Sequence, residues 1–121
     1  MRKTLLLFML LSVKLTFGQI SDDFTDGNFN LNPSWSGDDS KFYVNSSKQL
    51  QSSLTAIAQS VSLSTVNFLA TNVKWEFTVQ INFDPSATNR ARIYLISDQE
   101  NLNGSLNGYF LQIGESGTTD S

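Results

Sequence analysis

The segment from Val73 to Phe83 alternates strictly between apolar and polar side chains, and it constrains the fold more than any other part of the chain. Its odd-numbered residues are Val, Trp, Phe, Val, Ile and Phe, whereas its even-numbered residues are Lys, Glu, Thr, Gln and Asn. Successive side chains of a strand point to opposite faces, so the alternation predicts one long strand, with Trp75 and Phe77 buried and Lys74 and Glu76 solvated. One solvated face is typical of an antiparallel sheet, since parallel sheets are covered on both sides.

Shorter strands are predicted on both sides of this segment. The pattern predicts a hairpin with strands at 41–45 and 48–51, a strand over 60–65, and two further strands over 90–97 and 109–114. Residues rich in Asn, Asp, Gly and Pro separate the strands, and no stretch of the later chain keeps a helical period. About six strands at this spacing predict an all-β fold, an antiparallel β-sandwich.

The N-terminus has the pattern of a secretory signal peptide. A positively charged start is followed by an apolar run over 4–13 and by a small-residue cleavage motif that ends at Gly18. Ten apolar residues are too few to cross a hydrocarbon layer of about 30 Å, which needs about 20. We therefore expect a signal-peptide helix over 1–18, a mature chain that begins at Gln19 and has no transmembrane segment, and a secreted or cell-surface β-sandwich domain over 19–121.

The composition excludes several classes of function. The chain has no cysteine and no histidine, so it has no disulfide, no thiolate nucleophile, no sulfur-based zinc site and no histidine-dependent triad. Eleven acidic residues face eight basic ones, and three of the basic residues lie in the predicted signal peptide, which leaves a mature net charge of −6. An acidic chain without a basic face is a poor ligand for nucleic acid or anionic lipid. Carboxylate chemistry, hard-cation binding and recognition by an aromatic or polar surface remain.

Two parts of the chain resemble concanavalin A-like jelly-roll domains of secreted bacterial proteins. Asp-Asp-Phe-Thr-Asp-Gly-Asn-Phe at 22–29, with Asn-Pro-Ser-Trp-Ser-Gly-Asp at 32–38, is similar to the opening of such domains, and the runs 91–99 and 106–115 are similar to their middle strands. More narrowly, the set resembles the N-terminal region of large Bacteroidetes cell-surface proteins that carry lamin-tail domains. A jelly roll needs about eight strands. We therefore expect these strands to form an incomplete sandwich, the N-terminal part of a longer domain.

The acidic stretch near the mature N-terminus is a candidate calcium site. Asp22, Asp23, Asp26 and Asn28 offer several oxygens within a short loop, and calcium takes six to eight oxygen ligands. Concanavalin A-like modules often bind calcium, so the resemblance adds to this hypothesis. The alternative is that Asp26 and Gly27 form a turn and that the aspartates are solvated, since the spacing does not match a helix-loop-helix calcium loop.

The glutamates do not form the pattern of a jelly-roll glycosidase. Such enzymes carry two Glu and an Asp at alternate positions of one strand, and hydrolysis needs two carboxyl groups about 5–10 Å apart. Glu76 is followed on its face by Thr78 and Gln80. Asp98 and Glu100 are two apart, but they lie where a strand enters an Asn-rich loop, which favours a solvated turn. The sequence therefore predicts a protein without enzymatic activity.

Aromatic side chains on the two C-terminal strands are the candidate ligand-binding residues. Tyr94 and Phe110 lie opposite the faces that carry the small aliphatic residues, so we expect them at the surface, and Arg92 shares the face of Tyr94. Aromatic rings can stack on sugars, and the Arg92 guanidinium group could bond sugar hydroxyls; the alternative, which the usual exposure of arginine side chains favours, is that Arg92 is a solvated charge. If the sheets pack through this face instead, the two aromatic residues belong to the core.

Three functions are compatible with these patterns. The first is a non-catalytic module that recognises glycan, with polysaccharide or downstream domains of the same protein as partners. The second is a structural spacer or adhesin segment without a small ligand. The third, which the glutamate pattern disfavours, is a fragment of a jelly-roll glycosidase.

Overall fold

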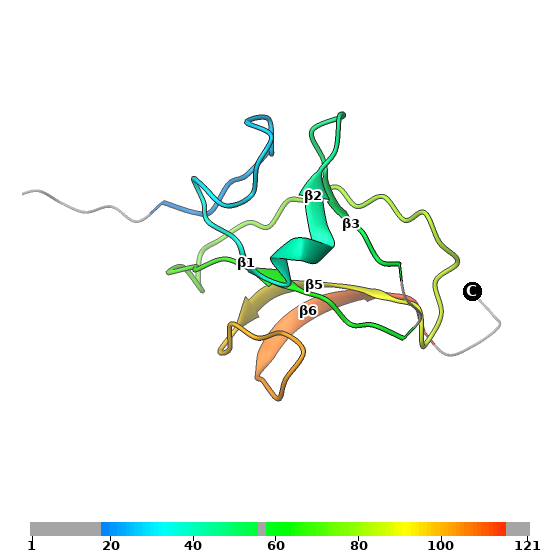
Figure 1. Cartoon of the computed structure of the whole chain (residues 1–121). Helices are drawn as coiled ribbons and strands as arrows, with labels where there is room; N and C mark the ends of the chain where they lie inside the picture. The colour runs from blue at the N-terminus through cyan, green and yellow to red at the C-terminus, as the bar shows by residue number, and fades with distance from the viewer. Residues whose placement is uncertain (1–17, 56–57, 116–121) are drawn as a thin grey trace, which may run out of the picture.

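The computed structural model describes residues 18–55 and 58–115, and within them short strands are joined by long irregular segments (Figure 1). The elements in chain order are β1 (Ser36–Gly37), the 3-10 helix η1 (Asp39–Lys41), β2 (Phe42–Val44), β3 (Leu50–Ser52), β4 (Leu63–Ser64), β5 (Ala91–Ser97) and β6 (Gly108–Ile113). Residues 1–17, which hold almost all of the predicted signal peptide, lie outside the described part.

The strands pair as three separate two-stranded antiparallel ladders, β1 with β4, β2 with β3 and β5 with β6. The predicted all-β class with antiparallel pairing is therefore confirmed. The finer prediction of a jelly-roll sandwich stays a prediction. None of the described residues belongs to a helix that is long and apolar enough to cross a membrane.

The β2–β3 hairpin forms where the sequence predicts it, around Ser46 and Ser47. Its register places Phe42 opposite Ser52 and Val44 opposite Leu50. The side chain of Asn45 organises the turn, because its Oδ1 accepts hydrogen bonds from the backbone N–H of Ser47 at 2.9 Å and of Gln49 at 3.0 Å. An Asn that bonds its own turn in this way is a common device for reversing the chain.

The β5–β6 ribbon is the longest ladder, and it contains a bulge that the sequence does not reveal. Tyr94 pairs with Phe110 but Ile96 pairs with Tyr109, so Leu95 is an extra residue on β5. A bulge shifts every later side chain to the other face. Strict alternation would place Ile96, two residues after Tyr94, on the same face as Tyr94, but the bulge places it opposite Tyr109 on the other side of the ribbon.

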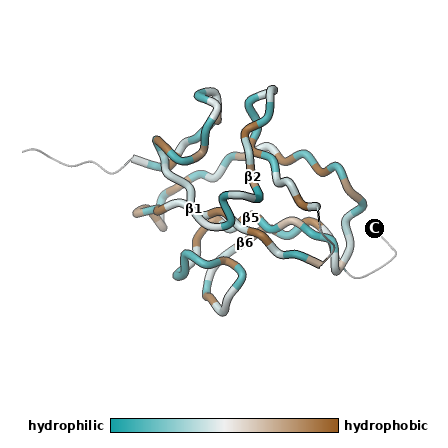
Figure 2. The backbone as a smooth tube through the Cα atoms, viewed as in Figure 1, coloured by the Kyte–Doolittle hydropathy of each residue, from teal (hydrophilic) through white to brown (hydrophobic). Residues whose placement is uncertain are grey.

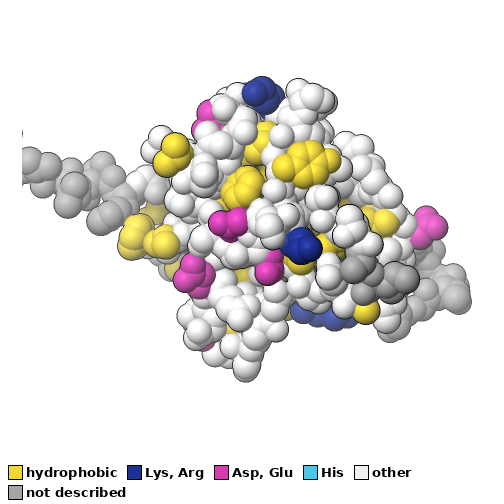
Figure 3. All heavy atoms as spheres, in the orientation of Figure 1, with side chains coloured by type: hydrophobic (Ala, Val, Ile, Leu, Met, Phe, Trp, Pro, Cys, Tyr) yellow, Lys and Arg dark blue, Asp and Glu magenta, His cyan; other side chains and the backbone are white. Residues whose placement is uncertain are grey.

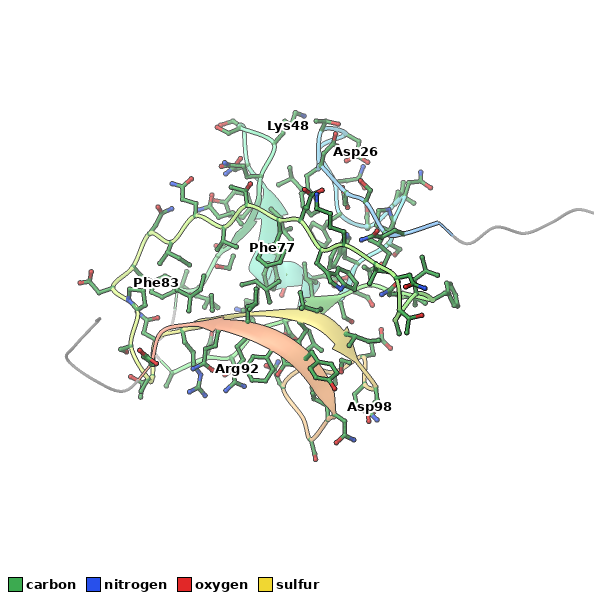
Figure 4. The ribbon with its side chains drawn as sticks, turned by 180° about the vertical axis from the view of Figure 1, so that it is seen from behind. Asp26, Lys48, Phe77, Phe83, Arg92 and Asp98 are labelled. Atoms are coloured by element: carbon green, nitrogen blue, oxygen red, sulfur yellow. The ribbon has the colours of Figure 1, made fainter. Side chains whose placement is uncertain are left out.

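The segment 73–83 is extended but belongs to none of the ladders, which corrects the strongest prediction from the sequence. It runs as a separate extended segment on the far side of the molecule from η1 (Figures 1 and 4), with its alternation of apolar and polar residues visible along the tube (Figure 2). The alternation predicts that both Trp75 and Phe77 are buried, but Trp75 is only half-buried and Phe77 is 45% exposed. The predicted solvation of Lys74 and Glu76 is confirmed, and the two form an exposed ion pair at 2.7 Å.

No residue of the described part is fully buried, polar or apolar. The interior lies between the β5–β6 ribbon on one side and the β2–β3 hairpin with segment 73–83 on the other (Figure 4), and its side chains are half-buried. Large apolar side chains reach the surface instead (Figure 3), because each two-stranded ladder covers only one narrow face.

Candidate functional site

The outer face of the β5–β6 ribbon brings together the three residues that the sequence nominates for ligand binding. Arg92 and Tyr94 are two apart on β5, before the bulge, so they share a face. The register places Tyr94 opposite Phe110, and Arg92 opposite Gln112. We call these four residues the aromatic–polar face, and Figure 4 shows the Arg92 side chain on the side of the ribbon that points away from Phe77.

The side chains of this face hold one another in place. The ring centroids of Tyr94 and Phe110 lie 5.1 Å apart at an angle of 45°. The guanidinium carbon of Arg92 lies 4.9 Å from the centroid of Phe110, within cation–π distance. Arg92 Nε donates to Gln112 Oε1 at 2.8 Å, and Gln112 Nε2 donates to the carbonyl of Gly114 at 2.8 Å. Rotamers fixed in this way lose little entropy when a ligand binds.

The face also keeps groups free for a ligand. Phe110 is 42% exposed, Arg92 and Gln112 are exposed, and Tyr94 is half-buried. The terminal amino groups of Arg92 make no hydrogen bond within residues 18–55 and 58–115, so they can donate to an acceptor in solution. An apolar ring surface beside hydrogen-bond donors suits a ligand that has both C–H and hydroxyl surfaces.

Gln112 is the member of the face that the sequence analysis missed. The same alternation that places Tyr109, Leu111 and Ile113 together puts Gln112 beside Phe110. The role of Gln112 can be inferred only from the strand register, because the pairing with Arg92 is what places its amide against the guanidinium group.

Each of the three aspartates of the candidate calcium site accepts a hydrogen bond from the backbone N–H two residues further along the chain. Asp22 Oδ1 accepts from the N–H of Phe24 at 2.9 Å, Asp23 Oδ1 from that of Thr25 at 3.0 Å, and Asp26 Oδ1 from that of Asn28 at 3.1 Å. These are Asx-type turns, the local pattern in which Asp side chains compete with secondary structure.

The second carboxylate oxygens of Asp22 and Asp26 and the side chain of Asn28 form hydrogen bonds as well. Asp22 Oδ2 accepts from the indole N–H of Trp35 at 2.8 Å, and Asp26 Oδ2 accepts from Asn28 Nδ2 at 2.7 Å. The Thr25 hydroxyl and backbone N–H, which donate to Asp23, lower the pKa of that carboxyl. In the described part of the chain, no three acidic side chains converge as a metal site requires. Calcium binding at these residues stays a prediction.

Each of the carboxylates considered for catalysis has a different bonding partner. Glu76 is paired with Lys74, whereas Glu100 Oε1 accepts from the hydroxyl of Ser36 at 2.8 Å. Asp98 closes its loop: Oδ1 and Oδ2 accept from the backbone N–H and the side-chain amide of Asn107, both at 2.8 Å. Both hydrogen bonds lower the pKa of Asp98, and the bond from the Asn107 side chain has the larger effect. A lowered pKa suits a structural carboxylate rather than a general acid near neutral pH.

A second feature is an open polar pocket of about 600 Å³ where loops from three parts of the chain meet. Its lining is Gly37, Asp38, Ser62, Gln99, Glu100, Asn101 and Asn103. Asp38 Oδ2 accepts from the backbone N–H of Ser62 at 2.8 Å, which fixes one wall. Sequence reasoning missed this pocket, because the residues that line it are up to 66 positions apart and no local motif joins them.

Comparison with known protein families, with curated proteins and with solved structures finds no match to this chain.

Proposed function

We propose that this chain is a non-catalytic, glycan-recognising module of a secreted or surface-attached bacterial protein. The observation that carries the proposal is the aromatic–polar face, in which the Tyr94 and Phe110 rings lie beside the Arg92 guanidinium group and the Gln112 amide. Sugar rings present C–H faces that pack on aromatic rings and hydroxyls that hydrogen-bond to fixed polar groups. The acidic balance of the chain favours a neutral glycan over a polyanionic one.

The scaffold in this proposal is a concanavalin A-like jelly roll, of which the three ladders are parts. The antiparallel pairing and the β5–β6 ribbon support it, together with the resemblance of 22–38 and 91–115 to modules of Bacteroidetes surface proteins that carry lamin-tail domains. Export through the N-terminal signal completes the proposal, with a mature protein that begins at Gln19. N-terminal sequencing of the secreted protein tests it, and an intact Met1 outside the cell would contradict export.

The test of glycan recognition is retardation of the protein in gels that contain neutral polysaccharides. Phe110→Ala removes the ring that both Arg92 and Tyr94 contact, and we expect binding at least about tenfold weaker, which is about 1.4 kcal/mol. Tyr109→Ala is the matched control, because Tyr109 is the neighbouring aromatic residue on β6, points to the other face and is 76% exposed.

Two outcomes would contradict the proposed site. An equal loss of polysaccharide binding in both variants would show that binding depends on the integrity of the β5–β6 ladder and not on the aromatic–polar face. A complete absence of retardation for the unmodified protein with every polysaccharide would favour the alternative, a structural spacer or adhesin segment without a small ligand.

A further inference from the structure

Segment 73–83 exposes an unpaired strand edge. It is extended, yet within the described residues it makes no backbone–backbone hydrogen bond. Among residues 18–55 and 58–115, the one partner of a backbone group of this segment is the side-chain amide of Gln19, which donates to the Lys74 carbonyl. A row of free N–H and C=O groups on an extended chain is a template for pairing with another strand.

The side chains along this edge also favour pairing with another strand, because several large apolar ones are exposed to solvent. Val79 and Phe83 are each 39% exposed, and Phe77 is more exposed still, although all three lie on the apolar side of the alternation. The polar side carries Lys74, Glu76, Thr78, Gln80 and Asn82, all exposed. An added strand with the same alternation would continue both faces.

The segment is complementary to itself when it is paired antiparallel about Thr78. In that register each aromatic residue lies opposite a β-branched aliphatic one: Val73 opposite Phe83, Trp75 opposite Ile81 and Phe77 opposite Val79. Aromatic–β-branched cross-strand pairs are among the stabilising ones in antiparallel sheets.

The polar side is complementary in the same register. Thr78 lies opposite Thr78 of the copy, Glu76 opposite Gln80 and Lys74 opposite Asn82, so no two like charges oppose each other. Thr–Thr pairs are favourable, and like charges directly opposite are not. A slip by one residue would place apolar side chains opposite polar ones on both faces.

We propose that segment 73–83 is a homodimerisation strand, which pairs with the same segment of a second copy about a two-fold axis at Thr78. The same patch then serves both subunits, as in the two-fold interfaces that most homodimers use. The pairing satisfies the free backbone groups and places the exposed aromatic residues against aliphatic ones.

Disulfide trapping tests this register, because the chain has no cysteine of its own. In the proposed dimer the two Thr78 residues exchange their backbone N–H···O bonds, so their Cα atoms lie about 5.5 Å apart, within disulfide range. Thr78→Cys in the full chain should therefore form a covalent dimer under mild oxidation. Gln80→Cys is the matched control: its two copies lie about 13 Å apart along the strands at about 3.3 Å per residue, beyond disulfide reach.

A second measurement does not depend on oxidation. Sedimentation velocity of the full chain should show a dimer that dissociates on dilution, and Thr78→Pro should shift it to the monomer, because proline cannot donate to the ladder. The Thr78 N–H has no partner in the described part, so the monomer keeps its hydrogen bonds and its circular dichroism should be unchanged. A monomer at all concentrations, or equal trapping at positions 78 and 80, would overturn the proposal.

Discussion

The sequence predicts strands both in the β5–β6 ribbon and in segment 73–83, but the two regions have different fates. Ala91–Ser97 is paired along its length apart from the bulge at Leu95, whereas the more strictly alternating 73–83 has no backbone partner in the described part. The distance along the chain to the next strand does not explain the difference, because the connection 84–90 after segment 73–83 is shorter than the loop 98–107 after β5. In that loop both carboxylate oxygens of Asp98 accept hydrogen bonds from Asn107, next to the point where β6 pairs with β5. Alternation therefore specifies an extended chain, and pairing also requires a connection that holds the partner in register.

The largest expected effect tests the closure of the paired region. A Cβ added at Gly108 would lie 2.4 Å from the Ile96 carbonyl oxygen, and because that atom belongs to the backbone, the ladder must shift. We expect Gly108→Ala to lower the free energy of unfolding by about 1–3 kcal/mol, the range for overpacking. Gly104→Ala is the control, in the loop that precedes β6: a Cβ at Gly104 meets no atom closer than 3.7 Å, and the change should stay within about 0.5 kcal/mol. Urea denaturation measures both, and equal values would mean that the loop is not held by the ladder.

The second prediction compares one aromatic residue from each region. Tyr94→Ala should cost about 2 kcal/mol, roughly half the value for a fully buried aromatic side chain, because Tyr94 is half-buried and packs on Phe110. Phe77→Ala should cost about 1 kcal/mol or less in the monomer, because Phe77 is more exposed and its strand is unpaired. The measurement is urea denaturation at a concentration at which the protein is monomeric. A larger loss for Phe77 than for Tyr94 would show that segment 73–83 contributes more to the stability of the monomer than its exposure indicates.

The third prediction concerns pH. Because the Asn107 bonds lower the pKa of folded Asp98 below its ordinary value of 3.8, they stabilise the fold above that pH, and the stabilisation is lost as the pH falls through the lowered pKa. Carbon NMR of the carboxyl group should show Asp98 titrating below its ordinary value in the folded protein. Asn107→Ala should return the pKa toward 3.8, and an unchanged pKa in that variant would contradict the assigned cause.

The smallest effect is expected at the charged pair of the unpaired segment. The side chains of Lys74 and Glu76 are 78% and 75% exposed, so solvent screens their attraction. Glu76→Ala should change the free energy of unfolding by no more than about 0.5 kcal/mol, and added salt should remove even that. Thermal denaturation at low and high salt provides the measurement. A change above about 1 kcal/mol would mean that Glu76 has a partner not seen in this structure.

Sequence reasoning located the local elements well, for a physical reason. The β2–β3 hairpin and the β5–β6 ribbon are set by alternation and by turn residues such as Asn45 and Asp98, which act within a few positions. The joint position of Arg92, Tyr94 and Phe110 followed from the same alternation. The Asx turns at Asp22, Asp23 and Asp26 match the alternative in which these residues form local turns.

Features that depend on register or on distant contacts were not predictable. The bulge at Leu95 is one extra residue in a regular alternation, and only the pairing of Ile96 with Tyr109 exposes it. The polar pocket joins Asp38, Ser62 and the loop after β5, which no local pattern connects. For Phe77, alternation indicated the face but not whether another layer covers it.

The absence of a fully buried side chain among the described residues has a calorimetric consequence. The heat capacity change of unfolding and the denaturant m-value both scale with the surface newly exposed, and half-buried side chains have less surface left to expose. A monomer of this size should therefore unfold with a heat capacity increment below the usual 1.2–1.5 kcal/mol/K or so for about 100 residues. Its stability curve should be flat, with a broad transition and little sensitivity to cooling.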